Sequence, residues 1–330
     1  MDKTIYEEMN EKLDGKNITI VFPEGEDERI QGAVERLYKE GKINPVLLGK
    51  VEAIEKIAKE KGFDLTNIPI IDPEKADDFE EMIDKFVERR KGKATADQAC
   101  EILKDPNYYG TMMIYVGKAD GMVSGAVHST GDTVRPALQI VKTKPGVSLV
   151  SGSMLMMGKG GERFMFADVG INITMTPEQM ADTAIQTAET AKLFDIDPKV
   201  AMLSFSTKGS AQHELVDAVV EATKIAQEKR PDLDIDGEMQ FDAALVESVG
   251  QRKAPGSKVA GHANVFVFPD LQSGNIGYKI AQRLGGFEAI GPILQGLNKP
   301  ISDLSRGCSE EDVYKLTIIT ANQALTDKES

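Results

Sequence analysis

The sequence predicts an α/β protein with two domains, each built on an open, mostly parallel β-sheet flanked by helices. Short apolar runs alternate with longer amphipathic ones along the chain, which is typical of alternating strands and helices. Several of the short runs are apolar throughout, as in parallel strands that are buried on both faces. The chain has 330 residues, which is more than a single domain with one hydrophobic core usually contains, so two domains are expected.

Eight short apolar segments are predicted as strands. They lie at 17–22, 45–48, 68–71, 112–116, 147–156, 163–167, 200–205 and 265–268. Eight longer segments are predicted as helices from the helical spacing of their apolar residues. They lie at 26–40, 51–61, 77–90, 95–103, 133–143, 177–194, 214–229 and 310–325. Capping boxes mark three helix starts, with the pairs Thr95 and Gln98, Thr176 and Gln179, and Ser309 and Asp312.

Two turns, at 142–146 and 298–300, are the expected crossing points between domains. We therefore expect a first domain at 1–143 that is completed by 301–330, and a second domain at 144–300. This division would bring the polar segment before the last helix into a cleft between the domains, where ligand sites are common.

Composition excludes several classes of protein. The net charge of −14 argues against binding to nucleic acid or to anionic membranes, so an anionic substrate would need a few well-placed arginines. No apolar run approaches the roughly 20 residues of a membrane span, and the charged N-terminus lacks the apolar core of a signal peptide. We therefore expect a cytoplasmic protein. Cys100 and Cys308 are expected to be free thiols, and no metal site is expected because the histidines lack ligand spacing.

Familiar nucleotide and hydrolase motifs are absent. The glycines at 158–161 lack the third glycine of a dinucleotide-binding turn, and the phosphate-binding loop pattern and the nucleophile elbow both fail.

Four polar segments beside helix ends are the candidate sites, because ligands of open α/β sheets bind at such loops. In the segment 124–136, Ser124, Ser129 and Thr130 offer hydroxyls beside helix-terminal N–H groups, and Arg135 can grip a phosphate with two hydrogen bonds. The purely structural interpretation of this segment is a turn in which Asp132 or Thr133 is the N-cap of the helix.

The other three segments also have structural explanations. The segment 269–279, with Ser273 and Asn275, is equally an ordinary loop between a strand and a helix. The basic cluster at 87–93, which contains Arg90, suits a helix C-terminus. In the segment 301–312, Ser305 and Arg306 precede a helix in whose first turn Asp312 is a natural cap.

Taken together, four segments resemble the phosphate acetyltransferase family in their order along the chain. They are Ile-Val-Phe-Pro-Glu-Gly at 20–25, the stretch 124–139, Phe-Pro-Asp-Leu-Gln-Ser-Gly-Asn at 268–275, and Asp-Leu-Ser-Arg-Gly-Cys-Ser at 303–309. The resemblance implies a homodimer of two-domain subunits with the active site between the domains, and no metal or prosthetic group. Its substrates would be coenzyme A, acetyl-CoA, acetyl phosphate and phosphate. The thiol of coenzyme A would attack the acetyl carbonyl directly in a ternary complex.

The resemblance also implies roles for individual residues. Asp312 matches the base that takes the thiol proton, and Ser305 matches a hydroxyl that donates to the carbonyl oxygen as it becomes negative. Arg306 and Arg135 match arginines that bind acetyl phosphate or stabilise the transition state. Arg90 matches a further binding arginine, although the register leaves its neighbour Arg89 open.

Three other functions stay open at this stage. The nearest is a phosphate butyryltransferase or another short-chain acyl transferase, since pocket volume alone would distinguish them. A metal- and nicotinamide-dependent β-decarboxylating dehydrogenase of similar shape would need acidic metal ligands and a nucleotide site, neither of which is identified. A two-domain anion-binding protein is the non-enzymatic alternative.

Overall fold

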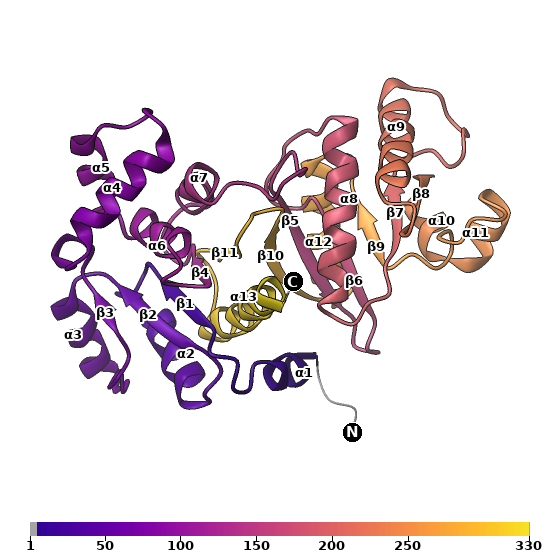
Figure 1. Cartoon of the computed structure of the whole chain (residues 1–330). Coiled ribbons are helices and arrows are strands. Elements are labelled where there is room, and N and C mark those ends of the chain that lie inside the picture. The colour runs from indigo at the N-terminus through magenta and orange to yellow at the C-terminus, as the bar shows by residue number, and fades with distance from the viewer. Residues whose placement is uncertain (1–4, 330) are drawn as a thin grey trace. The chain divides into compact units, whose positions relative to one another are not determined.

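The computed structural model of the chain describes residues 5–329 and divides into two compact units. Unit 1 runs as far as Lys142 and resumes at Leu297, and unit 2 is Thr143–Gly296. Each unit has its own β-sheet with helices packed on it (Figure 1), so the predicted α/β fold class is confirmed. No helix within the described residues combines the length and the apolar character needed to cross a membrane.

The sheet of unit 1 has five parallel strands in the order β11-β4-β1-β2-β3. The strands are β1 (Thr19–Phe22), β2 (Asn44–Leu48), β3 (Ile70–Ile71), β4 (Gly121–Ser124) and β11 (Ile301–Asp303). From β1 the chain builds outward to β3, and it then returns to place β4 on the other side of β1. The carboxyl ends of β1 and β4 therefore form the point at which the strand order reverses, where open α/β sheets bind ligands.

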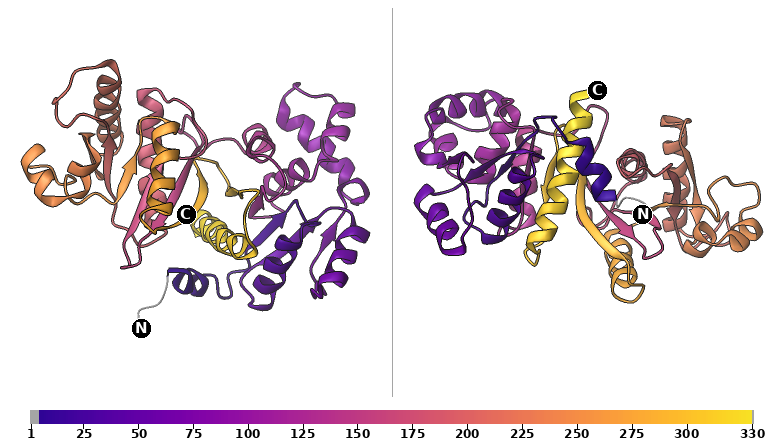
Figure 2. Two further views of the ribbon diagram at one scale, coloured as in Figure 1. Left: turned by 180° about the vertical axis from the view of Figure 1, so that it is seen from behind. Right: turned by 90° about the horizontal axis from the view of Figure 1, so that it is seen from below.

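Helices cover both faces of this sheet. They are α1 (Ile5–Lys12), α2 (Glu28–Lys39), α3 (Val51–Lys61), α4 (Phe79–Arg90), α5 (Ala96–Ile102), α6 (Pro106–Tyr115), α7 (Thr130–Ile140) and α13 (Glu310–Glu329), with a short 3₁₀ turn η1 (Pro73–Lys75). Figure 1 shows α2 and α13 on one side of the sheet and α6 and α7 on the other. The N-terminal α1 lies beside α13 (Figure 2), where the Asn322 amide donates to the Met9 carbonyl.

Unit 2 contains a mixed six-stranded sheet in the order β10-β5-β6-β9-β7-β8. The strands are β5 (Ser151–Met157), β6 (Arg163–Ala167), β7 (Lys199–Leu203), β8 (Asp234–Met239), β9 (Val265–Val267) and β10 (Glu288–Gln295). Strand β5 runs antiparallel to both neighbours, and the other pairs are parallel. The helices are α8 (Pro177–Lys192), α9 (Glu214–Lys229), α10 (Phe241–Leu245), α11 (Glu247–Lys253) and α12 (Leu271–Arg283). Phe166 packs against Phe266 and Phe268 in the core.

The predicted strand at 112–116 is wrong, because these residues belong to α6 and the residue that follows it. Asp105 caps this helix by accepting from the amides of Asn107 and Tyr108, and Pro106 occupies its first position. The helix is buried on almost every side, so its sequence lacks the polar stripe that identifies a helix at a surface. The sheet strand of this region is β4, which was not predicted.

The prediction also missed three further strands and misplaced one helix start. The missed strands are β8, which carries three charged residues, β10, which a Gly-Pro pair interrupts, and β11, which is only three residues long. Helix α7 begins at Thr130 with Ser129 as its cap, rather than at 133, so neither Asp132 nor Thr133 caps it. The three predicted capping boxes are confirmed, and both cysteines are free.

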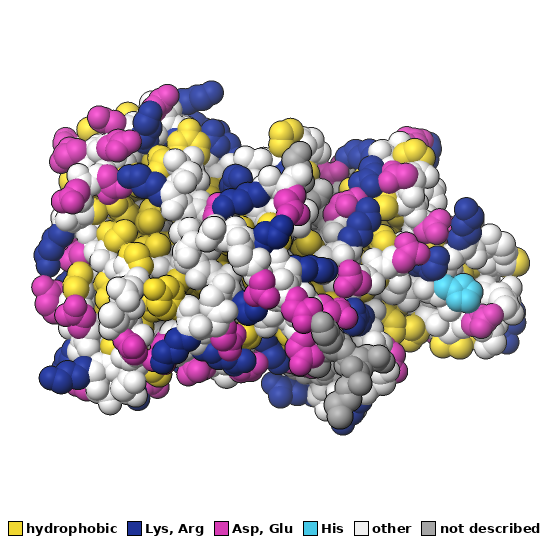
Figure 3. Space-filling view, turned by 60° about the horizontal axis from the view of Figure 1, so that its bottom comes forward, with side chains coloured by type: hydrophobic (Ala, Val, Ile, Leu, Met, Phe, Trp, Pro, Cys, Tyr) yellow, Lys and Arg dark blue, Asp and Glu magenta, His cyan; other side chains and the backbone are white. Residues whose placement is uncertain are grey.

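Acidic and basic side chains are interspersed over the face shown in Figure 3. On this face the net charge of −14 is not gathered into one acidic region. A local group of unpaired arginines can therefore set the sign of the potential at one place on the surface.

Two neighbouring glycines are expected to respond very differently to alanine. Gly125 has a φ of +105°, and an added Cβ would lie 2.5 Å from Asp303 Oδ1 and 2.6 Å from the backbone of Leu304. Gly131 lies in α7, where the nearest atom to an added Cβ is 3.7 Å away. We expect Gly125→Ala to lower the free energy of unfolding by about 3 kcal/mol or more, because backbone strain and overlap act together.

Gly131→Ala serves as the matched control, and we expect it to change stability by about 1 kcal/mol or less. Urea unfolding followed by circular dichroism measures both changes. Equal effects of the two substitutions would show that Gly125 is not needed for the close approach of the loop after β4 to β11.

Candidate functional site

The candidate site lies at the carboxyl edge of the unit 1 sheet, where β1, β4 and β11 end side by side. Ser124, the last residue of β4, is in register with Asp303, the last residue of β11. Three loops therefore meet here, at 23–27 after β1, 125–129 after β4 and 304–309 after β11. Most of the residues that the sequence marked as functional follow one of these strands.

Glu24 joins the first two loops through its carboxylate. It accepts hydrogen bonds from the backbone amides of Ala126, Val127 and His128 at 2.8–2.9 Å, and from the ring Nδ1 of His128 at 2.7 Å. The side chain is only 1% exposed. Burial raises the pKa of Glu24, but the bonds from His128, Val127 and Ala126 outweigh it and bring the pKa below its ordinary value. The same contact raises the pKa of His128.

Arg29, in the first turn of α2, joins the second and third loops. Its guanidinium donates to the carbonyl of Ala126 at 2.8 Å, and to those of Arg306 and Cys308 at 2.9 and 3.0 Å. Asp27 holds the guanidinium with a 2.8 Å ion pair. Both backbone polar groups of Ala126 are thus engaged, its N–H by Glu24 and its carbonyl by Arg29.

Asp303 is a second buried carboxyl, 2% exposed, at the end of β11. Burial raises its pKa to about 6, although its Oδ2 accepts a 2.6 Å bond from the hydroxyl of Thr130. Its Oδ1 has no partner among the described residues. The Ser124 hydroxyl is also inside, where it donates to the side-chain oxygen of Asn107 at 2.6 Å. The Ser124 side chain is therefore buried beneath the site and is not exposed at its surface.

The start of α7 carries the exposed donors of the site. Asp132 accepts from the amide and hydroxyl of Ser129, and the Arg135 guanidinium lies 3.9 Å from Asp132 with 61% of its side chain exposed. Among the described residues, the amides of Thr130 and Gly131 have no acceptor. Helix N-termini with free amides attract anions.

The structure separates the roles of Arg89 and Arg90. Arg89 donates to the carbonyls of Ile140 and Val141 at the end of α7, so its guanidinium is already engaged. The side chain of Arg90 has no hydrogen bond or ion pair within the described part of the chain. The pKa of Tyr108 is raised by burial, although the positive charges of Arg135 and Arg90 act to lower it. Arg90 is therefore the arginine that is free to bind a ligand.

The loop 304–309 presents Ser305 and Arg306 to solvent. The Ser305 hydroxyl accepts from the Gly307 amide at 3.3 Å, and the side chain of Arg306 contacts no polar partner in residues 5–329. Asp312, also exposed, accepts from the amide and hydroxyl of Ser309 at 2.8 Å, both through Oδ2. Cys308 is buried next to Arg29, and burial raises the pKa of its thiol, so it is a poor nucleophile.

The remaining predicted residues, Ser273 and Asn275, lie in unit 2 at the start of α12. The Ser273 amide and hydroxyl both donate to Asp270, and the Asn275 side chain donates to the carbonyl of Val169. Next to them the Asp168 carboxylate, which follows β6, accepts from backbone amides at 152 and 170–172. Both side chains therefore already have partners within unit 2.

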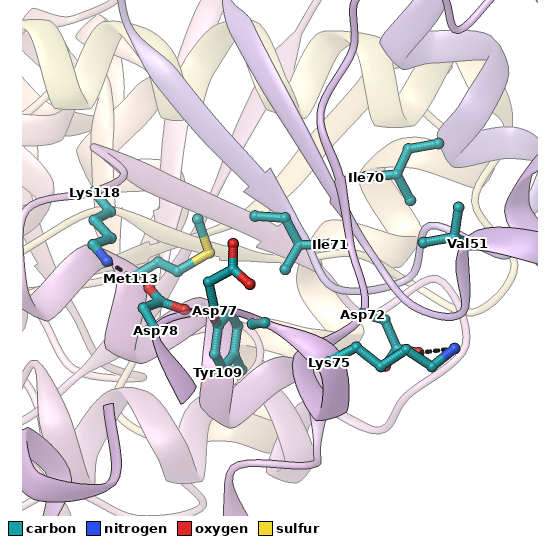
Figure 4. Close-up of a pocket in the computed structure, with 11 residues that line it drawn as sticks. Val51, Ile70, Ile71, Asp72, Lys75, Asp77, Asp78, Tyr109, Met113 and Lys118 are labelled. Carbon is teal, nitrogen blue, oxygen red and sulfur yellow. Dashed lines mark hydrogen bonds and ion pairs between the residues drawn. The ribbon is translucent and has the colours of Figure 1, made fainter. Parts of the chain in front are cut away.

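A separate hollow of about 570 Å³ lies at the carboxyl ends of β2 and β3 in unit 1. In Figure 4 Lys118 extends toward Asp78, which also accepts from the hydroxyl of Tyr109, and Asp77 stands between Ile71 and Met113. None of the residues marked by the sequence lines this hollow. Within the described residues, no group of three or more His, Cys, Asp or Glu side chains is arranged to hold a metal ion.

Sequence reasoning assigned no role to the supporting groups of the site, which are the buried Glu24, Asp303 and Asn107 and the partly exposed Arg29. Glu24 belongs to the segment 20–25 that carried part of the resemblance, yet no role was assigned to it. A buried carboxylate that directly follows a parallel strand is a signal that could have identified it.

Comparison with known proteins gives a consistent result. The family model described as phosphate acetyl/butaryl transferase matches residues 4–321. A phosphate acetyltransferase of Staphylococcus epidermidis is 58% identical over 322 residues, covering 96% of this chain and 98% of the relative. One of Bacillus subtilis is 57% identical over 321 residues, covering 97% and 99%. The solved structure of a phosphotransacetylase from Streptococcus pyogenes has a TM-score of 0.96 and 59% identity, and the match covers 98% of both chains.

Asp303→Asn is expected to change the pH dependence of stability. Because the pKa of Asp303 is raised from 3.8 to about 6 by folding, the folded protein keeps a proton that the unfolded chain loses. Stability due to this group is present at acid pH and lost as the pH rises from about 4 to about 6, by up to about 3 kcal/mol. The variant should lack this loss.

Urea unfolding of the wild type and of Asp303→Asn between about pH 4 and pH 7 measures this effect. We expect the free energy of unfolding of the variant to rise relative to that of the wild type as the pH increases. A constant difference across this range would show that Asp303 titrates normally.

Proposed function

Because this chain belongs to the phosphate acetyl/butaryl transferase family, we propose that it is a phosphate acetyltransferase, which moves an acetyl group between phosphate and coenzyme A. The observation that carries the proposal is the full-length similarity, at 57–58% identity, to two relatives that bear this name. The family indicated by the sequence motifs is thereby confirmed.

The proposed reaction is direct. The sulfur of coenzyme A forms a bond to the acetyl carbon of acetyl phosphate, the bond from that carbon to the phosphate oxygen breaks, and phosphate leaves. The thiol proton goes to the base, for which we propose Asp312. Its Oδ2 is engaged by Ser309, but its Oδ1 has no hydrogen bond within the described residues and can accept a proton.

We propose the start of α7 as the phosphate subsite. The free amides of Thr130 and Gly131 point out of a helix N-terminus, and the Arg135 Nη2 lies 3.8 Å from the Cβ position of Gly131. Arg90 adds a second cation, whose side chain has no partner among the described residues, and this helps an anion bind to a chain of net charge −14. These features support the assignment of both arginines and of the Thr130 amide to substrate binding. Ser129 remains a proposed binding residue with weaker support, since its amide and hydroxyl already donate to Asp132.

The roles of Ser305 and Arg306 rest on the family motif and on their exposure. An exposed hydroxyl and an unpaired guanidinium on one loop are suitable donors for the carbonyl oxygen, which becomes negative during transfer. Arg306 completes the set of three arginines proposed around the anion. Ser124, Ser273 and Asn275 remain proposed binding residues with weaker support, since their side chains already have partners.

The proposal includes further features implied by the family resemblance. We take units 1 and 2 as the two catalytic domains, and we propose a homodimer that acts in the cytoplasm. No metal ion or prosthetic group takes part in the proposed reaction, and coenzyme A and acetyl phosphate act as substrates.

The function is tested by mixing the protein with coenzyme A and acetyl phosphate and following thioester formation by absorbance. We expect rapid thioester formation that depends on both substrates. Butyryl phosphate in place of acetyl phosphate tests the nearest alternative, and a kcat/KM for butyryl phosphate above that for acetyl phosphate would favour it. A folded protein that forms no thioester from either compound would be an anion-binding protein instead.

Asp312→Asn is expected to lower kcat by about 10²- to 10⁴-fold, because an amide cannot take the thiol proton. The loss of capping should cost only about 1 kcal/mol of stability. Glu310→Gln is the matched control, since Glu310 lies in the same helical turn, is exposed and has no partner in the described structure. Steady-state rates and urea unfolding measure both effects, and near-normal turnover in Asp312→Asn would leave Asp312 as a cap only.

A further inference from the structure

The segment 20–25 carries part of the family resemblance, but none of the proposed catalytic or binding residues lies in it. Its Glu24 is one of the two buried carboxylates of the site, with a side chain 1% exposed. It lies at the end of β1, where the strand order of the sheet reverses. A residue so deeply buried does not contact a substrate, so any part it plays in catalysis must pass through the groups that it holds.

Those groups form a nest of amides. Three successive N–H groups, of Ala126, Val127 and His128, converge on the Glu24 carboxylate. Amides in such an arrangement bind anions in many proteins. Here the protein's own carboxylate occupies them, so they are not available to a substrate phosphate. The first free amides of this segment are those of Thr130 and Gly131, two residues farther along.

We propose that Glu24 is a positioning residue for acetyl transfer: it sets the conformation of the loop 125–129 and thereby aims the start of α7, with Thr130 and Arg135, at the phosphate of acetyl phosphate. This inference rests on the proposed function.

The contacts around Glu24 support this role, because they constrain the loop 125–129 at several points. His128 holds the carboxylate from the far end of the loop, with Nδ1 at 2.7 Å from Oε1. Arg29 binds the carbonyl of Ala126, the residue whose N–H donates to Glu24. Asp303, the nearby buried carboxyl, holds Thr130 at the other end of the segment. The loop between them is therefore constrained at both ends, and Glu24 supplies the acceptor for its middle.

Glu24→Gln tests the inference, because the shape is kept while one of the two acceptor oxygens becomes a donor. Oε1 and Oε2 both accept amide protons, so a glutamine must face at least one N–H with its own NH₂ in either orientation. Asp182→Asn is the matched control. Asp182 is also buried and accepts from Ser148 and Lys229, but it belongs to unit 2 and has no hydrogen bond to the loops of unit 1 among the described residues.

Two measurements are made on each protein. We expect Glu24→Gln to raise the KM for acetyl phosphate about 10-fold or more and to lower kcat/KM roughly 10- to 100-fold. We also expect hydrogen exchange to become about 10-fold faster at the amides 126–128. Asp182→Asn should leave both unchanged. A purely structural role would reduce the amount of active enzyme, and so the apparent kcat, without changing KM.

Each outcome is decisive. An unchanged KM in the Glu24→Gln variant overturns the inference, and so does a raised KM with unchanged exchange at 126–128. If the wild type forms no thioester, the proposed function fails, whereas the exchange measurement still shows whether Glu24 holds the loop. If Glu24→Gln does not fold, His128→Ala removes one of the four bonds at a partly exposed side chain and should produce smaller changes of the same kind. A wild-type KM in that folded variant then overturns the inference.

Discussion

The carboxylate of Glu24 is the interaction on which the candidate site depends. It lies where the chain passes from β1 to α2, at the reversal of strand order, and it binds the loop that follows β4. Arg29, five residues later, binds the same loop and the loop that follows β11. One short connection thus fixes three loop ends. The desolvation of its charges is offset because nearly every lone pair and N–H has a partner.

Charge is distributed at this site in two layers. The buried layer is acidic, with Glu24 and Asp303 beneath the loops, and it organises backbone and hydroxyl donors. The exposed layer carries the basic groups: Arg306 lacks a side-chain partner in the described structure, as does the partly exposed Arg90, and Arg135 lies 3.9 Å from Asp132. This arrangement lets a strongly acidic protein offer an attractive surface to an anion at one edge of a sheet.

Sequence reasoning predicted the fold class, but it assigned no role to the buried groups of the candidate site. Strands such as β1 and β2 are apolar after their first residue, and capping pairs such as Thr176 and Gln179 are local signals. Helix α6 was mistaken for a strand because burial on almost every side removes its periodicity. The role of Glu24 could not be predicted, since its partners are about a hundred residues away and a sequence does not show which loops meet. Arg89 and Arg90 were indistinguishable until the carbonyls of α7 were in place.

The discontinuous course of unit 1 determines the order in which the protein can be completed during synthesis. Strand β11 and helix α13 belong to unit 1, but the ribosome makes them after all of Thr143–Gly296. Until then β4 has an open edge, which is a site for unwanted pairing with other chains. The nascent unit 1 must therefore stay unaggregated while about 150 further residues are made, and unit 2 is the first to have its whole sequence available for folding.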